Sequence, residues 1–111
     1  MSSMMRIKDW SGVPRRALTP TEIVMRLAAM PGWKLSGDGD NAAIEKTFHF
    51  RDYDQTMAFV NAVAFIAKVE DHHPDMSVHY NRCVVRYSTH AVKGISASDF
   101  DCAARVDALL G

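Results

Sequence analysis

Apolar and polar residues alternate along residues 43–50, and Lys46 is the one charged residue among the positions that would face a core. Alternation with a period of two is typical of a strand that buries one face. Residues 37–41 are all glycine, aspartate or asparagine and predict a turn, and residues 33–36 before them predict a short strand. These segments therefore predict a β-hairpin with a five-residue turn.

A second hairpin is predicted from residues 77–80 and 83–88, with residues 81–82 in its turn. This prediction places His79 and Tyr80 on a strand, where adjacent side chains point to opposite faces. Strands joined by such short connections pair in an antiparallel manner. The two hairpins together predict four strands.

Helical periodicity and capping signals fill three other segments. The first helix is predicted to begin at Thr19, where a capping residue is followed by a proline and then by a glutamate at the third helical position. The second is predicted from Asp52 to about Val69, with its apolar residues on one stripe. The third is predicted to begin at Ser96, with Asp99 at its third position.

The resulting order, α-β-β-α-β-β-α, predicts an α+β fold in which a four-stranded antiparallel sheet has its helices packed on one face. The other face and one sheet edge would remain for solvent, a ligand or another subunit. Gly12 and Pro14 disfavour regular structure in residues 1–18, which are predicted to form a flexible leader. Residues 19–111 are predicted to form a single domain.

Composition narrows the functional classes. The chain has 111 residues and equal numbers of basic and acidic side chains, 13 of each, so it lacks the basic surface of a nucleic-acid-binding protein. It contains neither a signal peptide nor an apolar run long enough to span a membrane. Cys83 and Cys102 do not have the spacing of a metal or redox motif, and nothing requires a disulfide between them. A cytoplasmic location is therefore predicted.

Three histidines around the second hairpin are the main candidates for chemistry. His72 and His73 precede Pro74 directly after the second predicted helix, and His90 lies at the end of the last predicted strand. A hairpin that folds back can bring these two chain segments together, so the three imidazoles could converge on one pocket. Imidazole titrates near neutral pH, which suits acid–base catalysis. For any one of these histidines, capping of the helical carbonyls is an equally good explanation.

Two other kinds of site are less favoured. Adjacent histidines are poor chelators because their side chains usually diverge, and no further metal-binding spacing accompanies them, so no metal is predicted. A nucleophilic site is disfavoured because Cys83 lies in the middle of a strand and Ser88 lacks the context of an activated serine. Trp33 is expected to be half-buried, and it could also line a pocket for a flat heterocycle.

The spacing of these residues is more specific than any one of them. Lys68 is followed after three residues by His72-His73-Pro74, after five more by Tyr80, after nine by His90 and after eight by Asp99. In these residues and spacings the chain resembles the pterin-4a-carbinolamine dehydratases. The resemblance extends over residues 19–110, which is nearly the whole predicted domain.

This resemblance implies a hydro-lyase. Its substrate would be 4a-hydroxytetrahydropterin, the carbinolamine that remains when an aromatic amino acid hydroxylase has used its pterin. The products would be quinonoid dihydropterin and water, so the enzyme would recycle the pterin. The leaving hydroxide needs an acid and the N5 proton needs a base, and positioned histidines can supply both without a metal, a cofactor or a covalent intermediate.

The resemblance also implies roles for the site residues. His73 and His90 would form the proton-transfer pair, and His72 would bind and polarise the pterin. Asp99 would hold His90, or cap its helix, or do both. The residues expected to contact the polar edge of the pterin, besides the three histidines, are Asp71, Ser88 and Thr89. The other supporting residues are Trp33 and Pro74.

The chain departs from the family pattern at the edge of the motif. Met76 stands where many members have tryptophan, Lys68 where many have glutamate, and Asp71 where many have asparagine. These changes bear on substrate affinity more than on chemistry. The resemblance also implies a homo-oligomer, a dimer or a tetramer, with no direct contact to nucleic acid or membrane. The alternative is a non-catalytic pterin- or protein-binding module of the same fold, as in animal members that serve as a dimerisation cofactor of a transcription factor.

Overall fold

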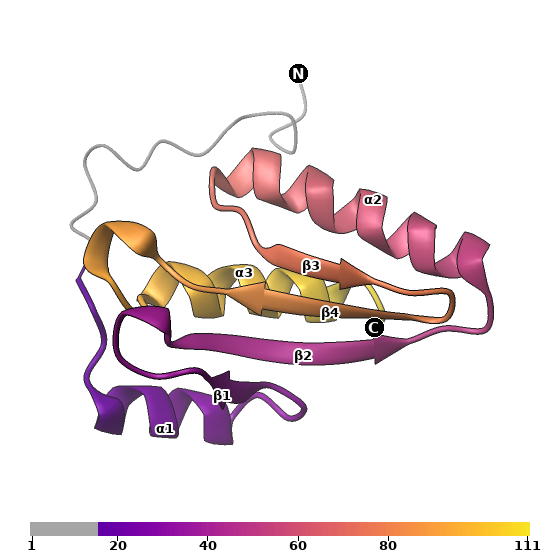
Figure 1. Cartoon of the computed structure of the whole chain (residues 1–111). Coiled ribbons are helices and arrows are strands. Elements are labelled where there is room, and N and C mark those ends of the chain that lie inside the picture. The colour runs from indigo at the N-terminus through magenta and orange to yellow at the C-terminus, as the bar shows by residue number, and fades with distance from the viewer. Residues whose placement is uncertain (1–15) are drawn as a thin grey trace.

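The computed structural model describes residues 16–111, and the first fifteen residues of the predicted leader lie outside this range. Three α-helices, four strands and two short 3₁₀-helices are present within it (Figure 1). In chain order they are α1 (Pro20–Ala28), β1 (Lys34–Ser36), η2 (Gly39–Asn41), β2 (Ala43–His49), α2 (Tyr53–Glu70), β3 (Asp75–Val78), β4 (Arg82–Tyr87), η3 (His90–Val92) and α3 (Ala97–Ala108). The predicted order of helices and strands is confirmed.

The strands form one antiparallel sheet in the order β1-β2-β4-β3. The two predicted hairpins are therefore β1–β2 and β3–β4, and they join through the central strands. β4 pairs with β2 over the full length of β4, from Ile44 opposite Tyr87 to His49 opposite Arg82. β1 and β3 are the two edges of the sheet, so each leaves one side of its backbone without a neighbouring strand from residues 16–111.

One face of the sheet is buried beneath the helices. Cys83, Val85 and Tyr87 of β4 are fully buried, and Ile44 and Phe48 of β2 are also buried. Apart from the buried Ala43, the residues that alternate with them on these strands are at least partly exposed. The helix residues that complete this core are Phe59, Val63, Ala67, Phe100, Cys102, Ala103 and Val106. The predicted α+β fold with a four-stranded antiparallel sheet is confirmed.

Lys46, the polar exception on the buried face, is paired at the end of α3. Its Nζ lies 2.9 Å from Asp107 Oδ1 and donates to the Pro31 carbonyl at 3.3 Å. The indole Nε1–H of Trp33 donates to the other carboxylate oxygen of Asp107 at 3.0 Å. Trp33 is only 5% exposed, so the expectation of a half-buried side chain was wrong. The reason is that α3 covers Trp33 and also supplies the acceptor that its N–H needs.

The second hairpin begins earlier than predicted. β3 begins at Asp75 rather than at position 77, and it ends at Val78. The N–H of His79 donates to the Arg82 carbonyl at 2.9 Å, so His79 and Tyr80 belong to the turn and not to a strand. This register places Val78, which is 39% exposed, opposite the fully buried Cys83, and it leaves Tyr80 64% exposed at the tip of the hairpin.

The chain just before α1 is more ordered than the leader prediction implied. Leu18 is buried, and its N–H donates to the Ile95 carbonyl at 2.7 Å. Residues 16–18, which were predicted to be flexible, are therefore attached to the loop that precedes α3. The burial of one apolar side chain and a backbone hydrogen bond explain this difference.

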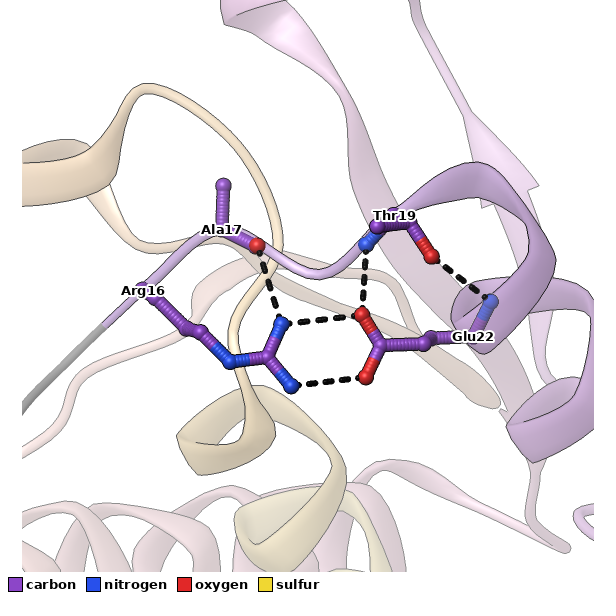
Figure 2. A network of polar contacts seen from close by, with 4 residues as sticks. All are labelled: Arg16, Ala17, Thr19 and Glu22. Carbon is purple, nitrogen blue, oxygen red and sulfur yellow. Dashed lines mark hydrogen bonds and ion pairs between the residues drawn. The ribbon is translucent and has the colours of Figure 1, made fainter.

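The start of α1 carries the predicted capping box. Thr19 Oγ1 accepts from the N–H of Glu22 at 3.2 Å, and Glu22 Oε1 accepts from the N–H of Thr19 at 2.9 Å. Arg16 adds a bidentate contact, with its two terminal nitrogens 2.9 and 2.7 Å from the carboxylate oxygens of Glu22 (Figure 2). The side-chain hydrogen bonds from Arg16, with the backbone N–H of Thr19, lower the pKa of Glu22 to about 2.

We expect Arg16→Ala to raise the pKa of Glu22 toward its ordinary value of 4.5. Because the folded pKa is depressed, the stabilisation from Glu22 is present above the unfolded pKa and is lost as the pH falls through the folded pKa. In the wild type this loss occurs between about pH 4.5 and about pH 2. An NMR titration of the Glu22 carboxyl in both proteins, with Arg51→Ala as a remote control, measures the shift. An unchanged titration in Arg16→Ala would contradict the assignment.

α2 and α3 lie against each other on the covered face. Glu70, which is buried at the end of α2, forms an ion pair with Arg105 of α3. This contact holds the end of α2 beside α3. Two of the candidate histidines follow directly after α2 ends. Within residues 16–111, no helix combines the length and the apolar character needed to cross a membrane.

Candidate active site

α2 ends in a left-handed turn that sends two histidines in different directions. Asp71 caps the helix with φ 52° and ψ 44°, a conformation that aspartate adopts more readily than most residues. The N–H of His72 donates to the Ala67 carbonyl at 3.1 Å and closes the turn. Pro74 then keeps the residue before it out of the helical region. As a result, His72 is buried, at 7% exposed, whereas His73 is exposed.

The segment after β4 supplies the other side of the site. Thr89 pairs with Gly94 in an isolated bridge, where the N–H of Thr89 donates to the Gly94 carbonyl at 2.8 Å. The residues between them form η3, and Lys93 turns the chain back with φ 54°. His90 therefore begins a 3₁₀-helix. This differs from the prediction, which placed His90 at the end of a strand. Its side chain is exposed.

These two segments lie at the end of the sheet opposite the β3–β4 turn (Figure 1). Residues of both segments line a cavity. Its volume is about 230 Å³. The residues that line it are Asp71, His72, His73, Ser88, Thr89, His90 and Ala91. The structure thus brings together all three candidate histidines and all three further residues predicted to contact a ligand. Ala91 was not predicted, because a lone alanine carries no chemical signal.

Asp99 is fully buried beside this cavity and accepts three hydrogen bonds. Its Oδ1 lies 2.6 Å from Nε2 of His72. Its Oδ2 accepts from the hydroxyl of Thr89 at 2.8 Å and from the N–H of Ser96 at 2.9 Å. The contact with the N–H of Ser96 belongs to the predicted capping box of α3. The expectation that Asp99 holds His90 was wrong, because the side chain that reaches its carboxylate is His72.

The contact with Asp99 decides which nitrogen of His72 carries a proton. A carboxylate only accepts hydrogen bonds, so its neighbour Nε2 is the donor. In a neutral imidazole the other nitrogen, Nδ1, is then an acceptor. This assignment follows from the partner of the ring and not from an observed hydrogen. A buried carboxylate that orients a histidine in this way is a common device of catalytic and metal sites.

Tyr87 is a contributor that the sequence analysis missed. Its ring lies parallel to the imidazole of His72, with the ring centroids 5.9 Å apart and the planes at 10°. Burial raises the pKa of its hydroxyl, and the acidic groups of Cys102, Asp99 and Glu70 raise it further. The available signal was its place on the buried face of β4, immediately before Ser-Thr-His.

Several residues of the sequence motif lie away from the cavity. Tyr80 is in the turn at the other end of β3, stacked against Tyr53 with 6.4 Å between ring centroids. His79 is partly exposed, and its Nε2 lies 3.0 Å from the hydroxyl of Ser77. Trp33 and Pro74 do not line the cavity either. Trp33 instead packs behind Tyr87, with ring centroids 6.3 Å apart, so its support for the site is indirect.

Metal coordination has no candidate group in the described part of the chain. Among residues 16–111, no three or more histidine, cysteine, aspartate or glutamate side chains are arranged to hold an ion. His72 and His73 diverge, as expected for adjacent residues, and His72 already bonds to Asp99. The histidines that line the cavity can transfer protons and can donate or accept hydrogen bonds.

Comparison with known proteins gives the same family as the resemblance seen in the sequence motif. Residues 16–109 match the sequence profile described as pterin 4 alpha carbinolamine dehydratase. A protein of Paracidovorax citrulli, provisionally named pterin-4-alpha-carbinolamine dehydratase, is 67% identical over 98% of this chain and 94% of its own. A protein of Stenotrophomonas maltophilia with the same provisional name is 48% identical over 98% of this chain and 96% of its own.

Solved structures share the fold. A transcriptional coactivator/pterin dehydratase from Brucella melitensis superimposes with a TM-score of 0.80 and 31% identity, over 86% of this chain and all of the other. A pterin dehydratase-like protein described as a RuBisCO assembly factor in the alpha-carboxysome gives a TM-score of 0.62 and 28% identity, over 74% of this chain and 93% of the other. The chain belongs to the pterin-4-alpha-carbinolamine dehydratase family.

Proposed function

We propose that this protein is a hydro-lyase that dehydrates 4a-hydroxytetrahydropterin to quinonoid dihydropterin by histidine acid–base catalysis. The observation that carries the proposal is the cavity in which His72, His73 and His90 meet. In the reaction the C4a–O bond breaks, and the oxygen leaves as water after it accepts a proton. The N5–H bond also breaks, and its electron pair forms the C4a=N5 double bond. No oxidant, reductant or covalent intermediate is required.

The burial of the histidines supports a division of labour. His73 and His90 are exposed, so each can exchange protons with water between turnovers. They are the proposed acid and base, one for the departing hydroxide and one for N5–H. His72 is buried and held by Asp99, so it cannot swing between donor and acceptor positions. Its proposed role is to bind and polarise the pterin through Nδ1, the nitrogen that Asp99 leaves free.

The remaining lining residues would contribute differently. Asp71 is exposed at the cavity, and its carboxylate is the proposed acceptor for N–H groups on the polar edge of the pterin. Ser88 lines the same cavity and is proposed as a second polar contact. The hydroxyl of Thr89 already donates to Asp99, and its N–H donates to Gly94. We therefore propose that Thr89 shapes the wall and supports Asp99, and that it offers the substrate no free donor.

The decisive experiment measures the dehydration of freshly generated 4a-hydroxytetrahydropterin with and without the purified protein, in the presence of a chelator. Acceleration that survives the chelator is the expected result. Positioned general acid–base catalysis contributes about 10²- to 10⁴-fold, which is enough to stand out from the background reaction. No acceleration by a folded protein would overturn the proposal.

The second candidate function is a binding module of the same fold. It is favoured by the two solved relatives, which are described as a transcriptional coactivator/pterin dehydratase and as a RuBisCO assembly factor. The experiment above separates the two functions, because a module that binds pterin without turning it over would show saturable binding and no acceleration. Retention of all three histidines around one cavity supports the enzyme.

The assembly and location of the protein follow as further parts of this proposal. We expect a homo-oligomer, a dimer or a tetramer, because the edge strands β1 and β3 have no neighbour within the described chain. Light scattering of the purified protein tests this expectation. Cys83 and Cys102 are both buried thiols that are not joined in a disulfide, which is compatible with a reducing cytoplasm.

A further inference from the structure

The imidazole of His72 is held by two contacts of different kinds. Asp99 Oδ1 lies 2.6 Å from Nε2 and fixes one atom of the ring. The ring of Tyr87 lies parallel to the imidazole at 10°, with 5.9 Å between centroids, and restrains the plane. A single hydrogen bond leaves a ring free to rotate about the line of that bond. The parallel neighbour removes this freedom, so the two contacts together determine the direction of Nδ1.

Tyr87 is itself rigidly placed. It is fully buried at the end of β4, and its partner across the sheet is Ile44. Trp33 packs against it with 6.3 Å between ring centroids. Trp33 is anchored in turn by its hydrogen bond to Asp107 at 3.0 Å. A chain of packed rings therefore runs from the core to the imidazole at the cavity, and no part of it contacts the proposed substrate site directly except His72.

The hydroxyl of Tyr87 does not explain why a tyrosine occupies this position. Within residues 16–111 this buried oxygen has no hydrogen-bond partner. An unpaired buried hydroxyl destabilises a protein, so tyrosine is a worse choice here than phenylalanine for stability alone. The useful part of the side chain is therefore its flat ring, which an aliphatic residue of similar volume would not reproduce.

We propose that Tyr87 is a positioning residue, whose ring holds His72 in the plane that keeps Nε2 on Asp99 and directs Nδ1 into the cavity. The consequence for rate rests on the proposed dehydratase function. The consequence for the geometry and tautomer of His72 does not rest on that function. It can be measured in the protein without any pterin.

The test compares Tyr87→Leu with the matched variant Tyr87→Phe, which keeps the ring and removes the hydroxyl. Imidazole ¹⁵N spectra should show His72 as the single Nε2–H tautomer in the wild type and in Tyr87→Phe. In Tyr87→Leu we expect a mixture of tautomers and faster exchange of the Nε2 proton with water. The dehydration kcat/KM should fall about threefold to tenfold in Tyr87→Leu and less than twofold in Tyr87→Phe, in keeping with the strength of aromatic stacking.

Val85→Ala is the control for a merely structural effect. Val85 is fully buried on the same strand, so its truncation weakens the core without removing a ring beside His72. This variant should lose stability and keep the wild-type spectrum of His72. The proposal is overturned if Tyr87→Leu retains the single tautomer and slow exchange, or if Val85→Ala disturbs His72 equally.

The wild type provides a second test that does not depend on whether Tyr87→Leu folds. The restrained imidazole of His72 should give one set of signals for its carbon-bound ring protons. Mixed tautomers in the wild-type protein would overturn the proposal. If the wild type failed to accelerate dehydration while His72 showed one protected tautomer, the dehydratase function would fail and the positioning role of Tyr87 would stand.

Discussion

Replacing either His73 or His90 by alanine is expected to lower the rate of dehydration at least tenfold while leaving the fold intact. Both side chains line the cavity and both are exposed, so their removal deletes a proton donor or acceptor without opening the core. Loss of a positioned acid or base typically costs about 10²- to 10⁴-fold. The measurement is the initial rate at saturating substrate, with circular dichroism to verify the fold.

The matched control for these variants is His79→Ala. His79 is partly exposed, and it lies in the turn at the other end of the sheet, where it contacts Ser77. The His79→Ala variant should keep the wild-type rate. A loss of rate common to all three variants would therefore point to a general effect of removing a histidine. Near-normal rates in His73→Ala and His90→Ala would contradict the assignment of the proton-transfer pair.

Asp99→Asn is expected to reduce the free energy of unfolding by about 1–3 kcal/mol, the cost of leaving a buried polar group without its partner. The carboxylate accepts from His72, Thr89 and the Ser96 N–H, and an amide has only one oxygen with which to replace two. If the amide nitrogen faces His72, it donates to Nε2 and moves the imidazole proton to Nδ1. Urea unfolding measures the first effect, and imidazole ¹⁵N spectra measure the second.

The rate of Asp99→Asn should fall less than the rates of His73→Ala and His90→Ala, because Asp99 acts through His72 and does not line the cavity. Asp101→Asn, an exposed substitution on the same helix, should leave both stability and rate unchanged. A larger rate loss in Asp99→Asn than in the two alanine variants would make the carboxylate a participant in proton transfer. Unchanged stability would show that its three hydrogen bonds contribute little.

Local patterns were sufficient to predict most elements of this fold. The alternation in residues 43–50 and the capping signals at Thr19 and Ser96 depend on residues within one turn or one strand of each other. Such interactions are the same wherever the segment lies in the molecule. The start of β3 was missed because Asp75 is a poor strand former, and it joins the sheet only through pairing with Arg86 on β4.

The sequence by itself determined the class of fold and most of the residues around the cavity, because the motif reflects two short segments that each keep their own geometry. Only the tertiary structure decided how these residues are arranged. His72 is buried and His73 is exposed, Asp99 contacts His72 and not His90, and the ring of Tyr87 lies parallel to the imidazole of His72. These contacts join residues far apart in the chain. They depend on where α3 lies relative to the end of α2, and local periodicity carries no information about that distance.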